Sequence, residues 1–213
     1  MDPAHTKSEP RFERRKDARP GEILDAALDL FVEKGFAATR LEDVAQRAGV
    51  SKGTVYLYFD SKEDLFKSVI RSGMVRAIEE AEQMVSGYEG SSADLLRQIF
   101  AGWWQHIGGT KLSGIPKLMI SESQNFPELA RFYYEEVIQR GSRLFARALE
   151  RGVERGEFRP VNIDYAVRAL IAPLIMRALL EHSFLRCAGP DHVDAPAYFA
   201  HTLDLMLDGL RAR

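Results

Sequence analysis

The chain has 213 residues, of which 46% are hydrophobic and 28% are charged, and its formal net charge is −2. This length can bury a substantial core in one large or two small domains, and the composition is that of a globular protein. The longest uncharged apolar run covers only residues 169–176, far short of the roughly 20 residues of a membrane span, and the single cysteine, Cys187, excludes an internal disulfide. We therefore expect a cytoplasmic protein that has no membrane partner.

The N-terminal residues separate into an arm and a first helix. Residues 1–16 are polar and contain Pro3 and Pro10, which predicts a flexible arm. Pro20 suits the first turn of the helix that follows, and Gly35 suits its end. The apolar stripe of this helix consists of Ile23, Ala27, Leu30 and Phe31.

The next segment has the pattern of two short helices joined by a sharp turn, over about residues 40–59. Gly49 can adopt the positive φ that an abrupt reversal needs, and small Ala45 lets the two helices pack closely. Thr39 and Glu42 have the spacing of a capping box. Ser51 and Ser61 stand where the next two helices begin and can cap them. The sequence therefore predicts a helix-turn-helix.

The charges around this turn are balanced, because residues 1–62 carry as many basic as acidic side chains. Arg40, Lys52 and Lys62 nevertheless each stand at or next to the start of a predicted helix. A helix start already favours a phosphate, because its free N–H groups and its dipole are positive. Three such positions predict a phosphate-binding surface of moderate affinity and modest salt dependence.

Glycines, prolines and apolar periodicity predict six further helices and no strand. The expected fold is all-α, with about nine helices in total and a helical bundle after the N-terminal three-helix domain. The six helices are expected at about residues 62–85, 93–107, 115–123, 128–155, 163–185 and 194–211.

Specific motifs connect the N-terminal region to a known family. The motifs are ILDAALDLF at 23–31, GFAAT at 35–39, VA at 44–45, AGVSKGTVY at 48–56, YF at 58–59 and SKEDL at 61–65. This pattern resembles the N-terminal domain of the TetR/AcrR family of bacterial transcriptional regulators. The resemblance covers roughly residues 17–77 and implies a DNA-binding domain there. From residue 78 to 213 the chain is similar to the family only in length and helical character, which implies a ligand-binding and dimerisation domain.

The resemblance implies a set of DNA-facing positions. Tyr56 and Tyr58 are two residues apart on a helix and cannot both face its core, so at least one of them is expected to be exposed. Lys52 and Thr54 are best placed to reach base edges, and Leu57 is a candidate for a thymine methyl contact. The DNA-binding candidates are Thr39, Arg40, Ser51, Lys52, Gly53, Thr54, Tyr56, Tyr58 and Lys62.

An aromatic cluster on the fifth predicted helix suggests a ligand cavity. Trp103 and Trp104 are about 100° apart around a helix, so one can enter a core while the other lines a neighbouring space. The alternative is that both belong to an ordinary bundle core. Apolar cavities in bundles lie between helices, and methionine adapts to irregular ligands. The ligand-binding candidates are Phe100, Trp103, Trp104, Met119, Phe132 and Met176.

The last two predicted helices carry more apolar residues than one bundle needs, which suggests a dimer interface. Paired across a two-fold axis, two helices from each chain would form a four-helix bundle. The interface candidates are Leu170, Leu174, Leu203, Leu207 and Leu210.

No residue pattern supports catalysis, a metal or a cofactor. His182, Cys187, His192 and His201 have spacings that match no zinc motif. The letters GVSKG at 49–53 match a nucleophile elbow, but that motif needs a strand before its helix. We therefore expect neither an enzyme nor a metal site.

These expectations combine into one function and one alternative. The function is a homodimeric repressor that binds a pseudo-palindromic double-stranded DNA operator, with recognition helices about 34–36 Å apart. A small, largely apolar ligand of unknown identity would tilt the helix that begins at Lys62 and so release the operator. The alternative is a chromosome-organising or division-linked DNA-binding protein of the same family that has no inducer.

Overall fold

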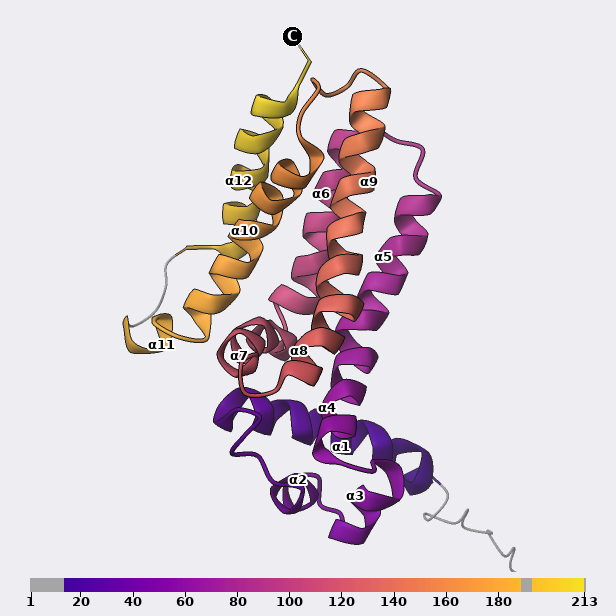
Figure 1. The fold of residues 1–213 in the computed structure, drawn as a ribbon, viewed down its shortest axis with the longest axis vertical. Helices are drawn as coiled ribbons and strands as arrows, with labels where there is room; N and C mark the ends of the chain where they lie inside the picture. The colour runs from indigo at the N-terminus through magenta and orange to yellow at the C-terminus, as the bar shows by residue number, and fades with distance from the viewer. Residues whose placement is uncertain (1–13, 189–192, 213) are drawn as a thin grey trace, which may run out of the picture.

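The computed structural model describes residues 14–188 and 193–212, which are almost entirely helical (Figure 1). Within these residues the β-type pairing consists of one isolated bridge, between Phe158 and Arg211. The predicted all-α class is therefore confirmed. The helices are α1 (Arg14–Lys34), α2 (Leu41–Arg47), α3 (Lys52–Tyr58), α4 (Lys62–Ile70), η1 (Arg71–Val75), α5 (Arg76–Ser86), α6 (Ser92–Trp103), η2 (Trp104–Gly108), η3 (Lys111–Ser113), α7 (Gly114–Glu122), α8 (Pro127–Tyr133), η4 (Tyr134–Gln139), α9 (Arg140–Glu154), α10 (Ile163–Glu181), α11 (Leu185–Ala188) and α12 (Ala195–Leu210). When segments that follow one another without a break count as one rod, the described residues form nine helices and the single turn α11.

Helices α1, α2 and α3 form the N-terminal domain at the bottom of Figure 1, where α4 joins it to the rest of the molecule. Its core is built on the buried rings of Phe31, Phe36 and Phe66, whose centroids lie 5.2–5.6 Å apart. Val44 of α2 and Val55 of α3 are fully buried beside them. Because buried aromatic rings remove large apolar areas from water, this cluster holds α2 and α3 against α1 and α4.

The turn between α2 and α3 has the local geometry that the sequence predicts. Gly49 has a φ of 66°, and the Ser51 hydroxyl accepts a hydrogen bond from the Thr54 amide at 3.1 Å. The Ser61 hydroxyl accepts from the Asp64 amide at 3.0 Å and caps α4 in the same way. Both predicted serine caps are confirmed, and Ser51 is therefore occupied as a helix cap.

The start of α2 differs from the expected capping box. The N-cap position is held by Arg40, whose side chain makes no capping hydrogen bond. The Thr39 hydroxyl instead donates to the carbonyl of Gly35 at 2.7 Å and to that of Leu30 at 3.2 Å. Thr39 thereby joins the start of α2 to the last turn of α1 and to Gly35 just after it, and its hydroxyl is occupied by these two carbonyls. The predicted capping box was wrong.

Helix α1 begins earlier than expected, at Arg14, so that Pro20 lies inside it. Residues 14–19 read RRKDAR, and most of these residues are good helix formers, which lets the helix extend before the proline. Of the arm predicted at residues 1–16, residues 1–13 lie outside the described residues.

Three of the rods contain a π-helical segment, namely η1, η2 and η4. A π turn carries one extra residue per turn, and such segments are frequent at functional sites. The η1 segment contacts both η2 and η4, so the three irregular segments meet in the middle of the molecule.

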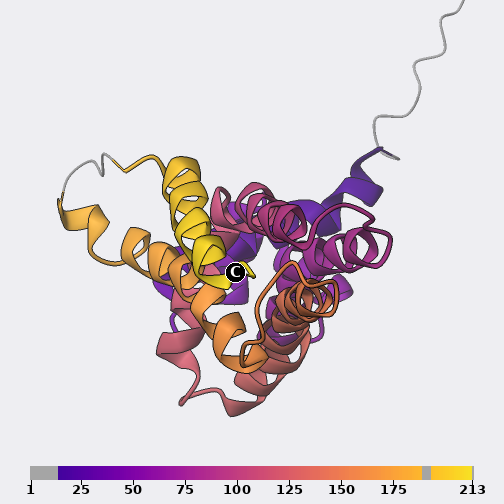
Figure 2. The ribbon, with the colours of Figure 1, turned by 90° about the horizontal axis from the view of Figure 1, so that it is seen from above.

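The C-terminal part is a bundle of long rods standing above the N-terminal domain (Figure 1). Helix α9 packs against α5, α6 and α10, while α12 packs against α6 and α10. Seen from above, α10 and α12 form one side of the bundle, opposite α5 (Figure 2). None of the helices in the described ranges is long and apolar enough to cross a membrane.

The five leucines proposed for a dimer interface lie inside this bundle. They are Leu170, Leu174, Leu203, Leu207 and Leu210, and all of them are buried within the single chain. They hold α10 and α12 against the other rods, so their apolarity is used by the chain's own core. This corrects the sequence-based choice of interface residues.

Candidate DNA-binding surface and ligand cavity

The outer face of α3 is exposed at the bottom of the molecule (Figure 1). Lys52 and Gly53 are exposed, Tyr56 is 47% exposed and Leu57 is 77% exposed, whereas Val55 is the buried residue of this helix. A Cβ atom on Gly53 would meet only the Ser51 hydroxyl, at 3.8 Å, so packing within the chain does not require glycine there. The bare backbone of Gly53 is thus open to an outside contact.

Lys52 is held at the start of α3 by an acidic neighbour. Its ammonium forms an ion pair with Glu42 of α2 and lies 5.6 Å from the ring centroid of Tyr56. The hydrogen bond between them lowers the pKa of the Glu42 carboxyl and raises the pKa of the Lys52 ammonium. Both side chains are more than half exposed, so the pair contributes little stability. Its effect is to neutralise a positive charge on this face.

Lys62 ties the start of α4 to the loop after α1. Its ammonium donates hydrogen bonds to the carbonyls of Phe36 at 2.8 Å and Ala37 at 3.1 Å, and it lies 4.5 Å from the ring centroid of Phe36. These two carbonyls occupy two of the three N–H donors of the ammonium, which leaves one for an outside acceptor. Sequence reasoning had not predicted this structural role.

The remaining DNA-binding candidates differ in exposure. Arg40 is exposed, while Thr54 and Tyr58 are half-buried; the Thr54 hydroxyl lies 2.8 Å from that of Ser51. Thr39 is only 1% exposed and its hydroxyl is bound to backbone carbonyls, so its side chain is not on the surface. Thr39 therefore supports the surface from inside and is not one of the exposed side chains.

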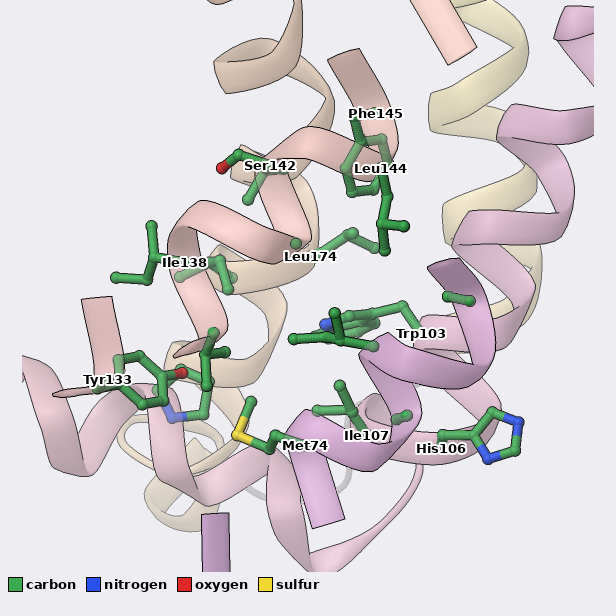
Figure 3. Close-up of a pocket in the computed structure, with 18 of the residues that line it drawn as sticks. Met74, Trp103, His106, Ile107, Tyr133, Ile138, Ser142, Leu144, Phe145 and Leu174 are labelled. Carbon is green, nitrogen blue, oxygen red and sulfur yellow. The ribbon is translucent and has the colours of Figure 1, made fainter. Parts of the chain in front are cut away.

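A cavity of about 800 Å³ lies in the bundle above this domain (Figure 3). It opens between the rods that carry the three π segments, together with α7 and α10. Its wall is overwhelmingly apolar, and its size suits a drug-sized or lipid-sized molecule. The lining residues are Met74, Ala77, Ile78, Glu80, Ala81, Met84, Gln98, Ile99, Gly102, Trp103, His106, Ile107, Pro116, Met119, Ile120, Ser123, Ala130, Arg131, Tyr133, Tyr134, Val137, Ile138, Gly141, Ser142, Leu144, Phe145, Ile171, Leu174 and Ile175.

Of the six ligand-binding candidates, the structure brings Trp103 and Met119 to this wall. The other four, Phe100, Trp104, Phe132 and Met176, do not line it. Phe100 stacks edge-on against Phe145 in the core, and Trp104 packs against Phe199. Phe132 lies against the cations of Lys67 in α4 and Arg71 in η1, which are 5.8 and 5.0 Å from its ring centroid. Met176 is 54% exposed on the outer side of α10.

Two lining residues that matter for the shape of the cavity were assigned otherwise or missed. Leu174, expected at a dimer interface, is 1% exposed and lines the cavity, whereas Met176 on the opposite side of α10 does not. Helix α10 is apolar on all sides, so its periodicity carries no information on which side faces inward. Tyr133 was not singled out at all. The only sequence signal for it is an aromatic pair, Tyr133 and Tyr134, in an otherwise amphipathic stretch.

Helix α7 connects the cavity to the N-terminal domain. Pro116, Met119 and Ile120 of α7 line the cavity. At the end of the same helix, a carboxylate oxygen of Glu122 accepts a hydrogen bond from the Ala37 amide at 3.2 Å.

Contacts on either side of α7 complete this link. At its start, Lys111 forms an ion pair with Asp29 of α1 at 2.6 Å. Just after its end, Phe126 stacks edge-on against Phe36, with ring centroids 4.7 Å apart. A displacement of α7 by a molecule in the cavity would therefore act directly on α1 and on the loop that follows it.

Two family models match the chain. One, described as bacterial regulatory proteins of the tetR family, matches residues 23–69. The other, described as a tetracyclin repressor-like C-terminal domain, matches residues 89–193. The first covers the helix-turn-helix, and the second covers most of the cavity wall.

Individual proteins are similar over longer stretches. The chain is 32% identical over 150 residues to the uncharacterized HTH-type transcriptional regulator YfiR of Bacillus subtilis, covering 69% of this chain and 71% of the relative. It is 28% identical over 197 residues to the HTH-type transcriptional repressor KstR2 of Rhodococcus jostii, covering 92% of each. The structure of the transcriptional regulator FadR from Bacillus subtilis in complex with stearoyl-CoA aligns with a TM-score of 0.75 at 22% identity, covering 89% of this chain and 98% of that one.

Proposed function

We propose, because this chain belongs to the TetR family of bacterial regulatory proteins, that it is a homodimeric repressor released from its operator by a largely apolar ligand. The observation that carries this proposal is the arrangement of the exposed α3 face, the cavity and the α7 link between them. Such a protein acts on DNA in the cytoplasm.

On the DNA side, we assign α3 to the major groove and the helix starts around it to phosphates. Lys52, Thr54 and Tyr56 are the side chains of α3 placed to reach bases or phosphates. Arg40 supplies a cation at the start of α2, and the bare backbone of Gly53 allows close approach of DNA.

On the ligand side, the proposed inducer occupies the cavity of about 800 Å³. The FadR neighbour is in complex with stearoyl-CoA, and the volume of this cavity suits a molecule of that chain length. A long-chain acyl thioester is therefore our first candidate ligand. The presence of a large apolar cavity argues against the alternative function without an inducer.

On the dimer side, we propose that the interface uses the outer side of α10 and α12. Tyr165, Met176 and Leu180 fall on one side of α10 by helical spacing, and all three are exposed. Phe184, which follows α10, and Leu205 of α12 are exposed apolar residues too, and we propose that they form one surface with these three, which we call the α10 stripe. An exposed apolar strip of this kind is typical of a protein–protein contact.

The test is operator binding with and without a ligand. DNA fragments upstream of the gene and its neighbours are titrated with the protein in a gel-shift assay, and stearoyl-CoA is then added to the complex. We expect one or two specific sites and their release on addition of stearoyl-CoA, with a coupling of about 1–3 kcal/mol. Dozens of dispersed sites, or a complex that no acyl thioester affects, would contradict the proposal.

A further inference from the structure

The polarity of the cavity wall is uneven. Tyr133 is the polar residue of the wall that is itself buried, at 7% exposure. Of the other polar lining side chains, Glu80, Gln98, His106 and Arg131 are exposed, and the two serines, Ser123 and Ser142, are half-buried. Figure 3 shows the side chain of His106 directed away from the cavity.

The hydroxyl of Tyr133 faces the cavity without a partner. Figure 3 shows its oxygen directed toward the open space, and no described residue forms a hydrogen bond with it. This oxygen is not among the fully enclosed side-chain polar atoms of the described residues that lack a hydrogen bond, so it is open to the cavity. A ligand oxygen that replaces water there can accept its hydrogen bond. Burial also raises the pKa of the Tyr133 phenol, which keeps it protonated and able to donate.

A second donor faces the same space. Figure 3 places the indole nitrogen of Trp103 toward the cavity, and an indole N–H can only donate. Two donors facing inward favour a ligand that brings an acceptor oxygen.

The charges around the cavity indicate whether the acceptor oxygen of the ligand is ionised or neutral. The cation among the described lining residues is Arg131, and it is exposed at the rim. An ionised carboxylate inside the cavity would therefore lie buried without a counter-charge, which is costly. At the end of the cavity far from Tyr133, Leu144 and Phe145 make the wall apolar (Figure 3).

We infer that the ligand of this cavity carries an uncharged carbonyl oxygen, as in a thioester, ester or ketone, which accepts a hydrogen bond from the Tyr133 hydroxyl. The apolar part of the ligand extends toward Leu144 and Phe145, and any ionised group of the ligand stays outside, near Arg131. The inference rests on the proposed function in one respect, that the cavity is the ligand site.

Two pairs of probes test it, each differing by one carbonyl group. The first pair is stearoyl-CoA and its S-octadecyl thioether, which has the same chain and head group. The second pair is a 3-ketosteroid and its parent steroid hydrocarbon. Binding to the full-length protein is measured by calorimetry and by quenching of Trp103 fluorescence in a Trp104→Phe variant. We expect the carbonyl member of a pair to bind about three- to tenfold more tightly, and this preference to disappear in Tyr133→Phe.

Tyr134→Phe is the matched control, because Tyr134 also lines the cavity but is half exposed, and this variant should keep the preference. The inference is overturned if Tyr133→Phe weakens both members of each pair equally, or if neither carbonyl probe binds. If the Tyr133-dependent preference is seen but no probe releases operator DNA, the proposed function fails while this inference stands.

Discussion

At the scale of single residues, the ion pair between Lys52 and Glu42 limits the charge that α3 presents. Glu42 lies on α2 and takes the Lys52 ammonium in the free protein. When a DNA phosphate approaches, the positive charge of Lys52 is already balanced by Glu42. The negative charge of the Glu42 carboxylate also repels the phosphate. We therefore expect the pair to lower DNA affinity, while it adds little to the stability of the fold.

We predict opposite effects from removing the two partners. Glu42→Gln should raise operator affinity about two- to fivefold and steepen its salt dependence by up to about one unit of log–log slope, because one more cation is available. Lys52→Ala should weaken binding and flatten the salt dependence. Titrations by fluorescence anisotropy at several salt concentrations check this. Weaker binding by Glu42→Gln would show that the carboxylate orients Lys52 rather than masking it.

The sequence predicted the role of a side chain correctly where its hydrogen-bond partner lies only a few residues away along the chain. The caps Ser51 and Ser61 follow from hydroxyl groups placed three residues before free amides, and both are present. Thr39 also carries a hydroxyl, but whether it turns forward to α2 or back to the end of α1 depends on the packing of α1, which the local pattern does not contain. The bonds of Lys62 to Phe36 and Ala37 likewise join residues about 25 positions apart.

At the scale of elements, the close approach of α7 to α1 depends on Gly114. A Cβ atom there would lie 2.5 Å from one methyl carbon of Val32 and 3.3 Å from the His182 ring. Val32 is β-branched and stiff, so it cannot swing aside easily. Ser113, the residue before, is also bound to His182 at 2.8 Å. The start of α7 is therefore clamped between α1 and the end of α10.

We predict that Gly114→Ala pushes α7 away from α1 and mimics the ligand-bound state in part. Operator affinity without ligand should fall about three- to tenfold, and the free energy of unfolding should fall by about 1–3 kcal/mol from overpacking. Gly21→Ala is the control, because a Cβ there meets nothing within 4 Å. Gel-shift titration and thermal unfolding measure the two effects. A Gly114→Ala variant that is destabilised but binds the operator normally would remove α7 from the coupling path.

The positions of the helices could be predicted from apolar periodicity and from helix-breaking glycines and prolines. Which side of a helix faces the interior could not always be predicted. Amphipathic α9 has one apolar side, and its inward residues follow from the pattern. Helix α10 is apolar all round, so the sequence does not distinguish Leu174, which lines the cavity, from Met176, which is exposed. The π segments, which help to form the cavity, depend on how the rods pack and leave no local sequence signal.

At the scale of the whole molecule, stable operator binding requires two copies of the helix-turn-helix. One recognition helix contacts too few bases to select a site in a genome. The buried leucines of α10 and α12 are already used inside each chain. The exposed α10 stripe is the surface of these two helices that we propose to join two chains.

We predict that Met176→Glu converts the dimer to folded monomers, because a charge in the centre of an apolar interface would be buried without a partner. Sedimentation velocity measures the change, and the far-ultraviolet circular dichroism of the variant should stay helical. Leu57→Glu also places a charge on an exposed apolar residue, but on α3, and should leave the dimer intact.

Leu207→Glu separates the two possible roles of α12. Leu207 is 1% exposed within the chain, so this change should unfold the protein rather than yield a folded monomer. Met176→Glu monomers should bind operator DNA about tenfold or more weakly, because each then holds a single half-site. A Met176→Glu protein that still sediments as a dimer would place the interface away from the α10 stripe. A folded monomer from Leu207→Glu would instead return the interface to the residues that the sequence first suggested.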